Sequence, residues 1–100
     1  MPKKVCVVIT ARPSYSRVRS ALVALRERGA ELQIIAAASA VMTRFGRIVD
    51  QIRVDGFDVT AEISSVVEDD SLANSALSTG LLLTQLAGLF QRLRPDVVVT

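Results

Sequence analysis

The stretch KKVCVVITARPSYS, residues 3–16, decides the fold of this chain. Its continuous apolar run VCVVI, residues 5–9, predicts a parallel strand buried on both faces, because a strand with one wet face would alternate. The polar turn that follows opens a helix. Arg12, Ser14 and Ser16 therefore lie where open α/β sheets bind ligands and where free N–H groups favour anions. Since this turn has no glycine, we expect a phosphate held by side chains.

Composition narrows the class of protein. The chain has 100 residues, half of them apolar, which is one domain at most with enough apolar surface for a core. Its 12 basic and 10 acidic residues are scattered, so we expect no nucleic-acid partner. Cys6 is the single cysteine, so a disulfide framework is excluded and a cytoplasmic location fits. We expect Cys6 to be a small buried apolar residue. Histidine, the commonest metal ligand and general base, is absent, and no apolar run is long enough for a signal peptide or a membrane span.

Periodicity predicts that strands and helices alternate along the chain. The third expected strand alternates apolar and polar residues and so belongs near a sheet edge, whereas the VVV run before Thr100 predicts a fourth, buried strand. The pattern β-α-β-α-β-α-β predicts an α/β fold with a Rossmann-like parallel sheet in the order 3-2-1-4. The expected strands are residues 5–10, 31–38, 57–63 and 97–100, and the expected helices are residues 16–28, 41–54 and 71–93.

Local signals refine the helix ends. Gly29 predicts the C-terminal cap of the first helix, and Ser71, which follows three acids, predicts the N-cap of the last helix. Gly80 and Gly88 are unfavourable inside a helix, so they predict close approach of another backbone or a bend. The leucines of that helix form a wide apolar band, and packing against the sheet is the favoured interpretation of it. The alternative is that part of the band is left as surface for a partner subunit.

Three familiar classes of nucleotide or phosphate protein do not fit the first turn. It lacks the glycines of the dinucleotide fingerprint, which argues against nicotinamide-dependent redox chemistry. It also lacks the Lys-Ser/Thr of a P-loop, which argues against an NTPase. A receiver domain needs clustered acids at the end of the first strand, where this chain has Thr10 and Arg12.

Arg12 is the strongest candidate for a ligand contact. Its guanidinium can form paired hydrogen bonds to phosphate, although a solvated turn arginine is the alternative. Ser16 lies in the first helical turn and could reach the same anion. Ser14 has two interpretations, an anion contact or the N-cap of the helix. Tyr15 is expected to be a packing residue.

Several blocks together resemble the UDP-N-acetylglucosamine 2-epimerase family, and in particular its hydrolysing branch of the sialic-acid-pathway type. The resemblance spans the whole chain and rests on the order and spacing of the blocks. These are VITARPSYS at residues 8–16, SAVMTRFG at 39–46, DGFDV at 55–59, STGL at 78–81 and RLRPDVVV at 92–99. One departure is Ala40, where hydrolysing relatives often carry histidine.

The resemblance implies the N-terminal part of a glycosyltransferase-B-like enzyme with two Rossmann-like domains and a nucleotide sugar between them. Such enzymes eliminate UDP to give a 2-acetamidoglucal, and the hydrolysing branch adds water to release N-acetylmannosamine, with no nicotinamide or catalytic metal. By match to the family motif, Arg12 and Ser16 would contact UDP, with Ser14 as a third candidate in the same turn. Homo-oligomers, dimers or tetramers, are also implied. The catalytic acid and base are expected beyond Thr100, so residues 1–100 would be an incomplete and by themselves inactive domain.

Other functions remain open at this stage. One is a non-hydrolysing epimerase, or an epimerase of a modified UDP-sugar, which would return a nucleotide-linked product. Another is a nucleotide-binding or interaction domain without catalysis.

Overall fold

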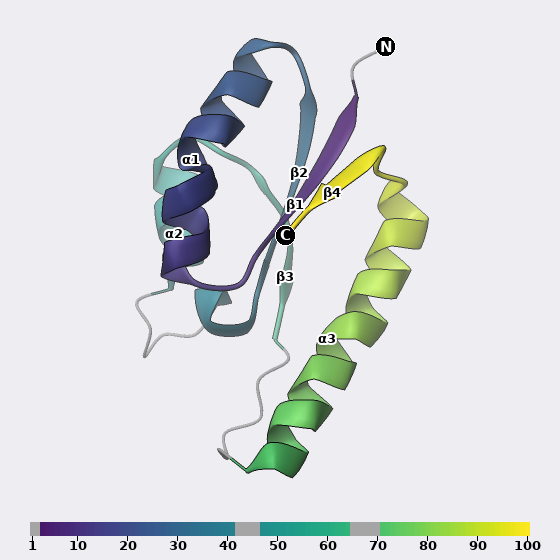
Figure 1. Cartoon of the computed structure of the whole chain (residues 1–100). Helices are drawn as coiled ribbons and strands as arrows, with labels where there is room; N and C mark the ends of the chain where they lie inside the picture. The colour runs from purple at the N-terminus through teal and green to yellow at the C-terminus, as the bar shows by residue number, and fades with distance from the viewer. Residues whose placement is uncertain (1–2, 42–46, 65–70) are drawn as a thin grey trace.

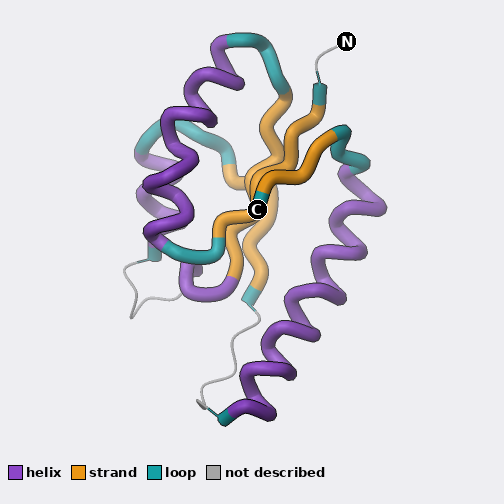
Figure 2. Tube along the Cα trace, viewed as in Figure 1, coloured by secondary structure: helices purple, strands orange, loops and turns teal. Residues whose placement is uncertain are grey.

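The computed structural model describes residues 3–41, 47–64 and 71–100. All strands in this part of the chain pair in parallel, in the order β3-β2-β1-β4 (Figures 1 and 2). This confirms the predicted α/β fold and its Rossmann-like strand order. The elements are β1 (Lys4–Ile9), α1 (Arg12–Glu27), β2 (Glu31–Ala37), the 3-10 helix η1 (Ala38–Val41), α2 (Ile48–Val54), β3 (Val59–Ile63), α3 (Leu72–Leu93) and β4 (Val97–Val99).

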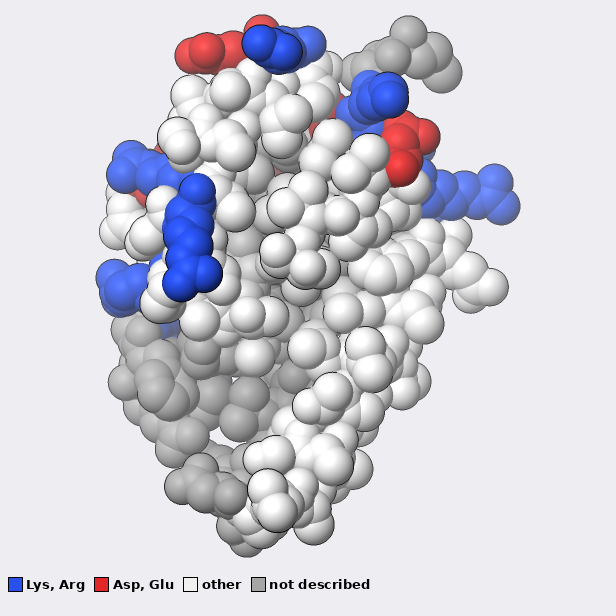
Figure 3. Space-filling model, viewed as in Figure 1, with Lys and Arg blue, Asp and Glu red and all other residues white. Residues whose placement is uncertain are grey.

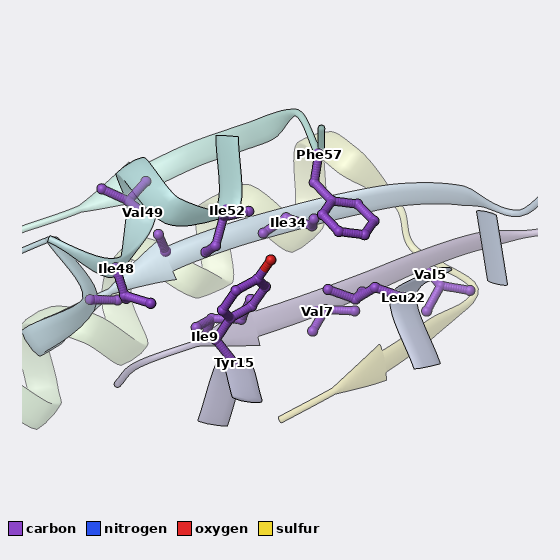
Figure 4. Close-up of a cluster of buried hydrophobic side chains, with 12 residues drawn as sticks. Val5, Val7, Ile9, Tyr15, Leu22, Ile34, Ile48, Val49, Ile52 and Phe57 are labelled. Carbon is purple, nitrogen blue, oxygen red and sulfur yellow. The ribbon is translucent and has the colours of Figure 1, made fainter. Parts of the chain in front are cut away.

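Two apolar cores cover the two faces of the sheet. Alternate residues of a strand point to opposite faces, so Val5, Val7 and Ile9 of β1 join one core while Cys6 and Val8 join the other. The first core contains buried residues of α1 and α2, and Figure 4 shows them around Ile34 of β2. The second core is closed by α3. Burial on both faces explains why β1 is apolar from Val5 to Ile9, and the prediction that Cys6 is buried is confirmed.

Of the predictions made for the two edge strands, β3 and β4, one is confirmed and one is wrong. The prediction that the alternating third strand lies at an edge is confirmed, because β3 has β2 as its neighbour and ends the sheet. The prediction that the fourth strand is buried is wrong, since Val97, Val98 and Val99 are 44%, 41% and 36% exposed. The reason is that β4 pairs with β1 alone, and neither core includes its valines in the described part of the chain.

The first helix begins earlier than expected, at Arg12 rather than Ser16. Pro13 explains this difference, because proline has the φ of a helix and lacks the N–H that would be unpaired in a first turn. Ala11 occupies the N-cap position without a side-chain hydrogen bond, so the interpretation of Ser14 as N-cap is wrong. Gly29 follows the helix with φ +82, as its predicted capping role requires.

The expected helix over 41–54 is shorter in the structure. Val41 ends η1, α2 spans Ile48–Val54, and residues 42–46 lie outside the described part. Arg47, with φ +40, has a left-handed conformation that cannot continue an α-helix backwards from α2. Its guanidinium donates to the backbone oxygen of Val41 at 3.1 Å and to Glu62 of β3 at 3.2 Å. Arg47 thus connects η1, α2 and β3.

The last helix and strand are held to the sheet by polar contacts as well as by leucines. The N-cap prediction is confirmed, because Ser71 Oγ accepts from the Asn74 amide at 3.1 Å. At the other end, Gln33 of β2 donates its side-chain amide to the Leu93 oxygen at 3.1 Å. Asp96 then sets the register of β4, since its carboxylate accepts from the Lys4 amide and its own amide donates to the Lys4 oxygen, both at 2.8 Å.

Substitutions at Ile52 and Val54, two positions of α2, test the packing of the first core. Ile52 is fully buried and Val54 is 79% exposed. We expect Ile52→Ala to lower the free energy of unfolding by about 2–5 kcal/mol, because it removes buried methylene groups and leaves a cavity. The matched change Val54→Ala should stay within about 0.5 kcal/mol. Urea unfolding measures both, and equal losses at the two positions would contradict this packing.

Candidate anion-binding groove

The candidate site lies at the point where the winding of the sheet changes direction. From β1 the chain proceeds to β2 and β3 on one side, whereas β4 pairs on the other side of β1. The helices follow this division, with α1 and α2 on one face and α3 on the other (Figure 1). Ligands of open α/β sheets bind at such a point, beyond the carboxyl ends of the strands. The turn from Ile9 to Arg12 occupies this position, and the Ala40 amide donates to the Thr10 oxygen at 3.1 Å, which brings η1 beside it.

A groove of about 280 Å³ runs from this turn between α1 and α2. Arg12, Ser16 and Arg19 line it from successive turns of one α1 face, and Ile48, Gln51 and Asp55 line it from α2 and its C-terminal end, with Tyr15 between them. Two of the predicted site residues, Arg12 and Ser16, are thus brought together. The third, Ser14, lies in the same helical turn but does not line the groove.

Arg12 and Arg19 differ in their pairing. The Arg19 guanidinium lies 3.4 Å from the Asp55 carboxylate. Arg12 is exposed, and no residue of the described ranges forms an ion pair or hydrogen bond with its guanidinium. It also follows the N-cap directly, where the unpaired N–H groups of the helix favour an anion. Arg12 is therefore the cation of this groove that is available to a ligand.

A partly buried polar network connects α1 to the C-terminal end of α2 in the groove. The Tyr15 hydroxyl donates to Asp55 Oδ2 at 2.5 Å, and Gln51 Nε2 donates to Asp55 Oδ1 at 2.9 Å. The Asp55 side chain is only 9% exposed. Figure 4 shows the Tyr15 ring packed near Ile9, Ile48 and Ile52, which agrees with the expected packing role and adds a polar one.

This network lowers the pKa of Asp55 and raises the pKa of Tyr15. The hydrogen bond from Tyr15 lowers the pKa of Asp55, with further contributions from Gln51 and Arg19 against the opposing effect of burial. Burial raises the pKa of Tyr15 to about 12, and Asp55 acts in the same direction. Asp55 is therefore ionised at neutral pH with its oxygens engaged, and Tyr15 is protonated. The carboxylate of Asp55 and the phenol of Tyr15 thus serve to position α1 against α2.

Sequence reasoning missed Arg19, Gln51 and Asp55. The spacing of positions 12, 16 and 19 was an available signal, because residues three or four apart share a helix face. No comparable signal identified Gln51 or Asp55, since the docking of α1 on α2 determines which of their residues meet.

A second charged cluster does not offer a site. Glu62 of β3 accepts from Arg47 at 3.2 Å and from Arg53 at 2.7 Å, and Asp50 pairs with both arginines. The hydrogen bond from Arg53 is the main cause that lowers the pKa of Glu62. These charges neutralise one another and connect α2 to β3. Across the described ranges, no three Asp, Glu, Cys or His side chains are grouped to hold a metal ion, and no helix has the length and apolar character needed to span a membrane.

No protein-family model matches this chain.

The Tyr15–Asp55 contact can be measured directly, because Tyr15 is the only tyrosine and the chain has no tryptophan. We expect the phenolate absorbance of the folded protein to titrate with a midpoint near pH 12, against 10.0 for an ordinary tyrosine. Asp55→Asn should lower the midpoint without returning it to the ordinary value, because burial persists. Tyr15 contributes its full stabilisation at any pH below the pKa that it has in the unfolded chain. This stabilisation is lost as the pH rises toward the pKa of Tyr15 in the folded protein. Circular dichroism at each pH checks the fold, and a folded midpoint near the ordinary value would contradict the contact.

Proposed function

We propose that this chain binds the UDP moiety of a nucleotide sugar, with Arg12 and Ser16 at its phosphates, as part of a hydrolysing UDP-N-acetylglucosamine 2-epimerase. The observation that carries the proposal is the exposed Arg12 guanidinium at the start of α1. It lies at the switch point of the sheet, lines the groove together with Ser16 and Arg19, and has no partner among the described residues. An arginine in this position favours a ligand with paired anionic oxygens, and phosphate has that geometry.

The identity of the anion comes from the sequence blocks. The VITARPSYS block that resembles the epimerase family contains β1, the turn and the beginning of α1. Position and resemblance therefore select the same residues, Arg12 and Ser16, by independent arguments. Ser14 remains a candidate contact in the first helical turn.

The proposed reaction determines what Arg12 contributes. When UDP leaves C1 of the sugar and C2 loses a proton, negative charge develops on the departing diphosphate. A guanidinium held at the start of a helix stabilises that charge in the transition state. Water then adds to the glucal to give N-acetylmannosamine. We assign no proton transfer to Asp55, because Tyr15, Gln51 and Arg19 already engage its carboxylate.

A second candidate function is nucleotide binding without catalysis. The hydrogen bond that the Asp55 carboxylate accepts from Tyr15 favours this candidate. The described lining of the groove then offers cations and hydroxyl groups, and its one carboxylate is already occupied.

Arg12→Ala tests the phosphate contact. Loss of a charge-assisted hydrogen bond should weaken UDP binding to the intact protein by about 1.5–3 kcal/mol, or about 10- to 150-fold, in isothermal titration calorimetry. Arg17→Ala is the matched control, because Arg17 is an exposed arginine of the same helix that does not line the groove. Unchanged UDP affinity in Arg12→Ala would defeat the proposed role.

Product analysis separates the candidate functions. The intact protein incubated with UDP-N-acetylglucosamine should release UDP and free N-acetylmannosamine, identified by NMR. A UDP-linked 2-epimer would indicate the non-hydrolysing branch instead. Binding of UDP without any turnover would favour the nucleotide-binding module.

A further inference from the structure

A cavity of about 180 Å³ lies at the end of the sheet opposite to the groove at Arg12. It opens between the C-terminal end of α1, the beginning of β2 and the turn that joins α2 to β3. The groove thus lies beyond the carboxyl ends of the strands, whereas this cavity lies near their amino ends. We call it the Phe57 cavity, and its apolar lining consists of Ala30, Leu32, Ile34 and Phe57.

The apolar lining suits the cavity to a hydrocarbon side chain. Ile34 is fully buried and Phe57 is 4% exposed, and Figure 4 shows both on the face of the sheet that α1 and α2 cover. A cavity of about 150 Å³ is large enough to hold a benzene ring. The Phe57 cavity therefore admits an apolar group as large as the side chain of leucine or phenylalanine.

Arg26 is a cation at the opening of the cavity, held in place by two contacts. Its guanidinium carbon lies 4.4 Å from the centroid of the Phe57 ring, and its Nη1 donates to the Gly56 oxygen at 3.1 Å. Its remaining N–H groups have no acceptor among the described residues. The edge formed by Nε and Nη2 is thus available, and such an edge can donate two parallel hydrogen bonds to a carboxylate.

Asp58 brings the opposite charge to the same cavity. It is exposed and forms no ion pair or hydrogen bond within the described ranges. A ligand with a carboxylate alone would be repelled by Asp58, and a ligand with an ammonium group alone would be repelled by Arg26. Figure 3 shows side chains of both signs at this end of the molecule, so the surroundings select neither sign. The ligand that satisfies both residues is a zwitterion.

We propose that the Phe57 cavity binds a free α-amino acid with an apolar side chain. The carboxylate of the ligand accepts from Arg26, its ammonium group donates to Asp58, and its side chain enters the apolar lining. An α-amino acid carries both charges next to the carbon that bears the side chain, so one small ligand makes all three contacts. A longer peptide carries its ammonium and its carboxylate at opposite ends and does not.

Titration of the intact protein with leucine, followed by NMR of the backbone amides, tests the site. We expect the amide signals of Gly56, Phe57 and Asp58 to shift, with a dissociation constant on the order of 1 mM. Isocaproate lacks the ammonium group of leucine, and isoamylamine lacks its carboxylate. Each should bind at least about 10-fold more weakly, because one charge-assisted contact is lost.

Three substitutions and one control assign the contacts. Arg26→Gln and Asp58→Asn each remove one charge and should each weaken leucine binding at least about 10-fold. Ala30→Leu keeps both charges but fills the cavity, so it should weaken leucine binding to the same extent or more. Arg28→Gln is the matched control, because Arg28 is an exposed arginine at the same helix end that does not line the cavity. It should change the constant by no more than about twofold.

Three results would overturn the proposal. They are amide signals at the cavity that neither leucine nor phenylalanine shifts at about 20 mM, isocaproate that binds as tightly as leucine, and leucine affinity that Arg26→Gln and Asp58→Asn leave unchanged. Circular dichroism establishes that each variant is folded. UDP affinity should be the same in all of these variants, because other residues line the groove at Arg12. Amino-acid binding is thereby tested separately from nucleotide binding.

Discussion

Burial of β1 on both faces and along both edges is the constraint on which the other elements depend. β2 and β4 pair with its two edges, and the two cores that meet on its faces contain Val7 on one side and Cys6 and Val8 on the other. Each buried aliphatic side chain contributes roughly 1.5–3 kcal/mol. A polar residue between Val5 and Ile9 would disturb the core that its side chain faces, and the polar residues of the stretch lie before Val5 and after Ile9.

The position of the candidate site follows from where β1 ends, at Ile9. Because β1 is central, its carboxyl end lies at the switch point of the winding, and the next residues cannot be buried in either core. Pro13 starts α1 at once, which sets Arg12 at the first position of the helix. The Tyr15–Asp55 contact then joins α1 to the end of α2, and both residues line the groove beside Arg12. Core packing and the proposed anion contact therefore depend on the same short segment.

The helices cover the two faces of the sheet to different extents. α1 and α2 cover one face of the sheet, with a polar groove between them. Among the described helices, the other face packs against the C-terminal half of α3. α3 carries no charged residue before Arg92, and four of its leucines are exposed: Leu72, Leu77, Leu81 and Leu83. One side of the sheet thus has a polar groove between its helices, and the other side has a helix with exposed leucines.

The sequence by itself determined the edge position of β3, the caps at Gly29 and Ser71 and the location of Arg12, because these follow from local periodicity and turn chemistry. It also determined the strand order, which follows from the β-α-β pattern and the handedness of its crossovers. Only the tertiary structure decided that the valines of β4 are exposed and that Ser16 and Arg19 line one groove with Asp55. These outcomes depend on how elements distant in sequence dock. A pattern of residues along one helix specifies the face that is buried, but it does not specify which residues of another helix that face will meet.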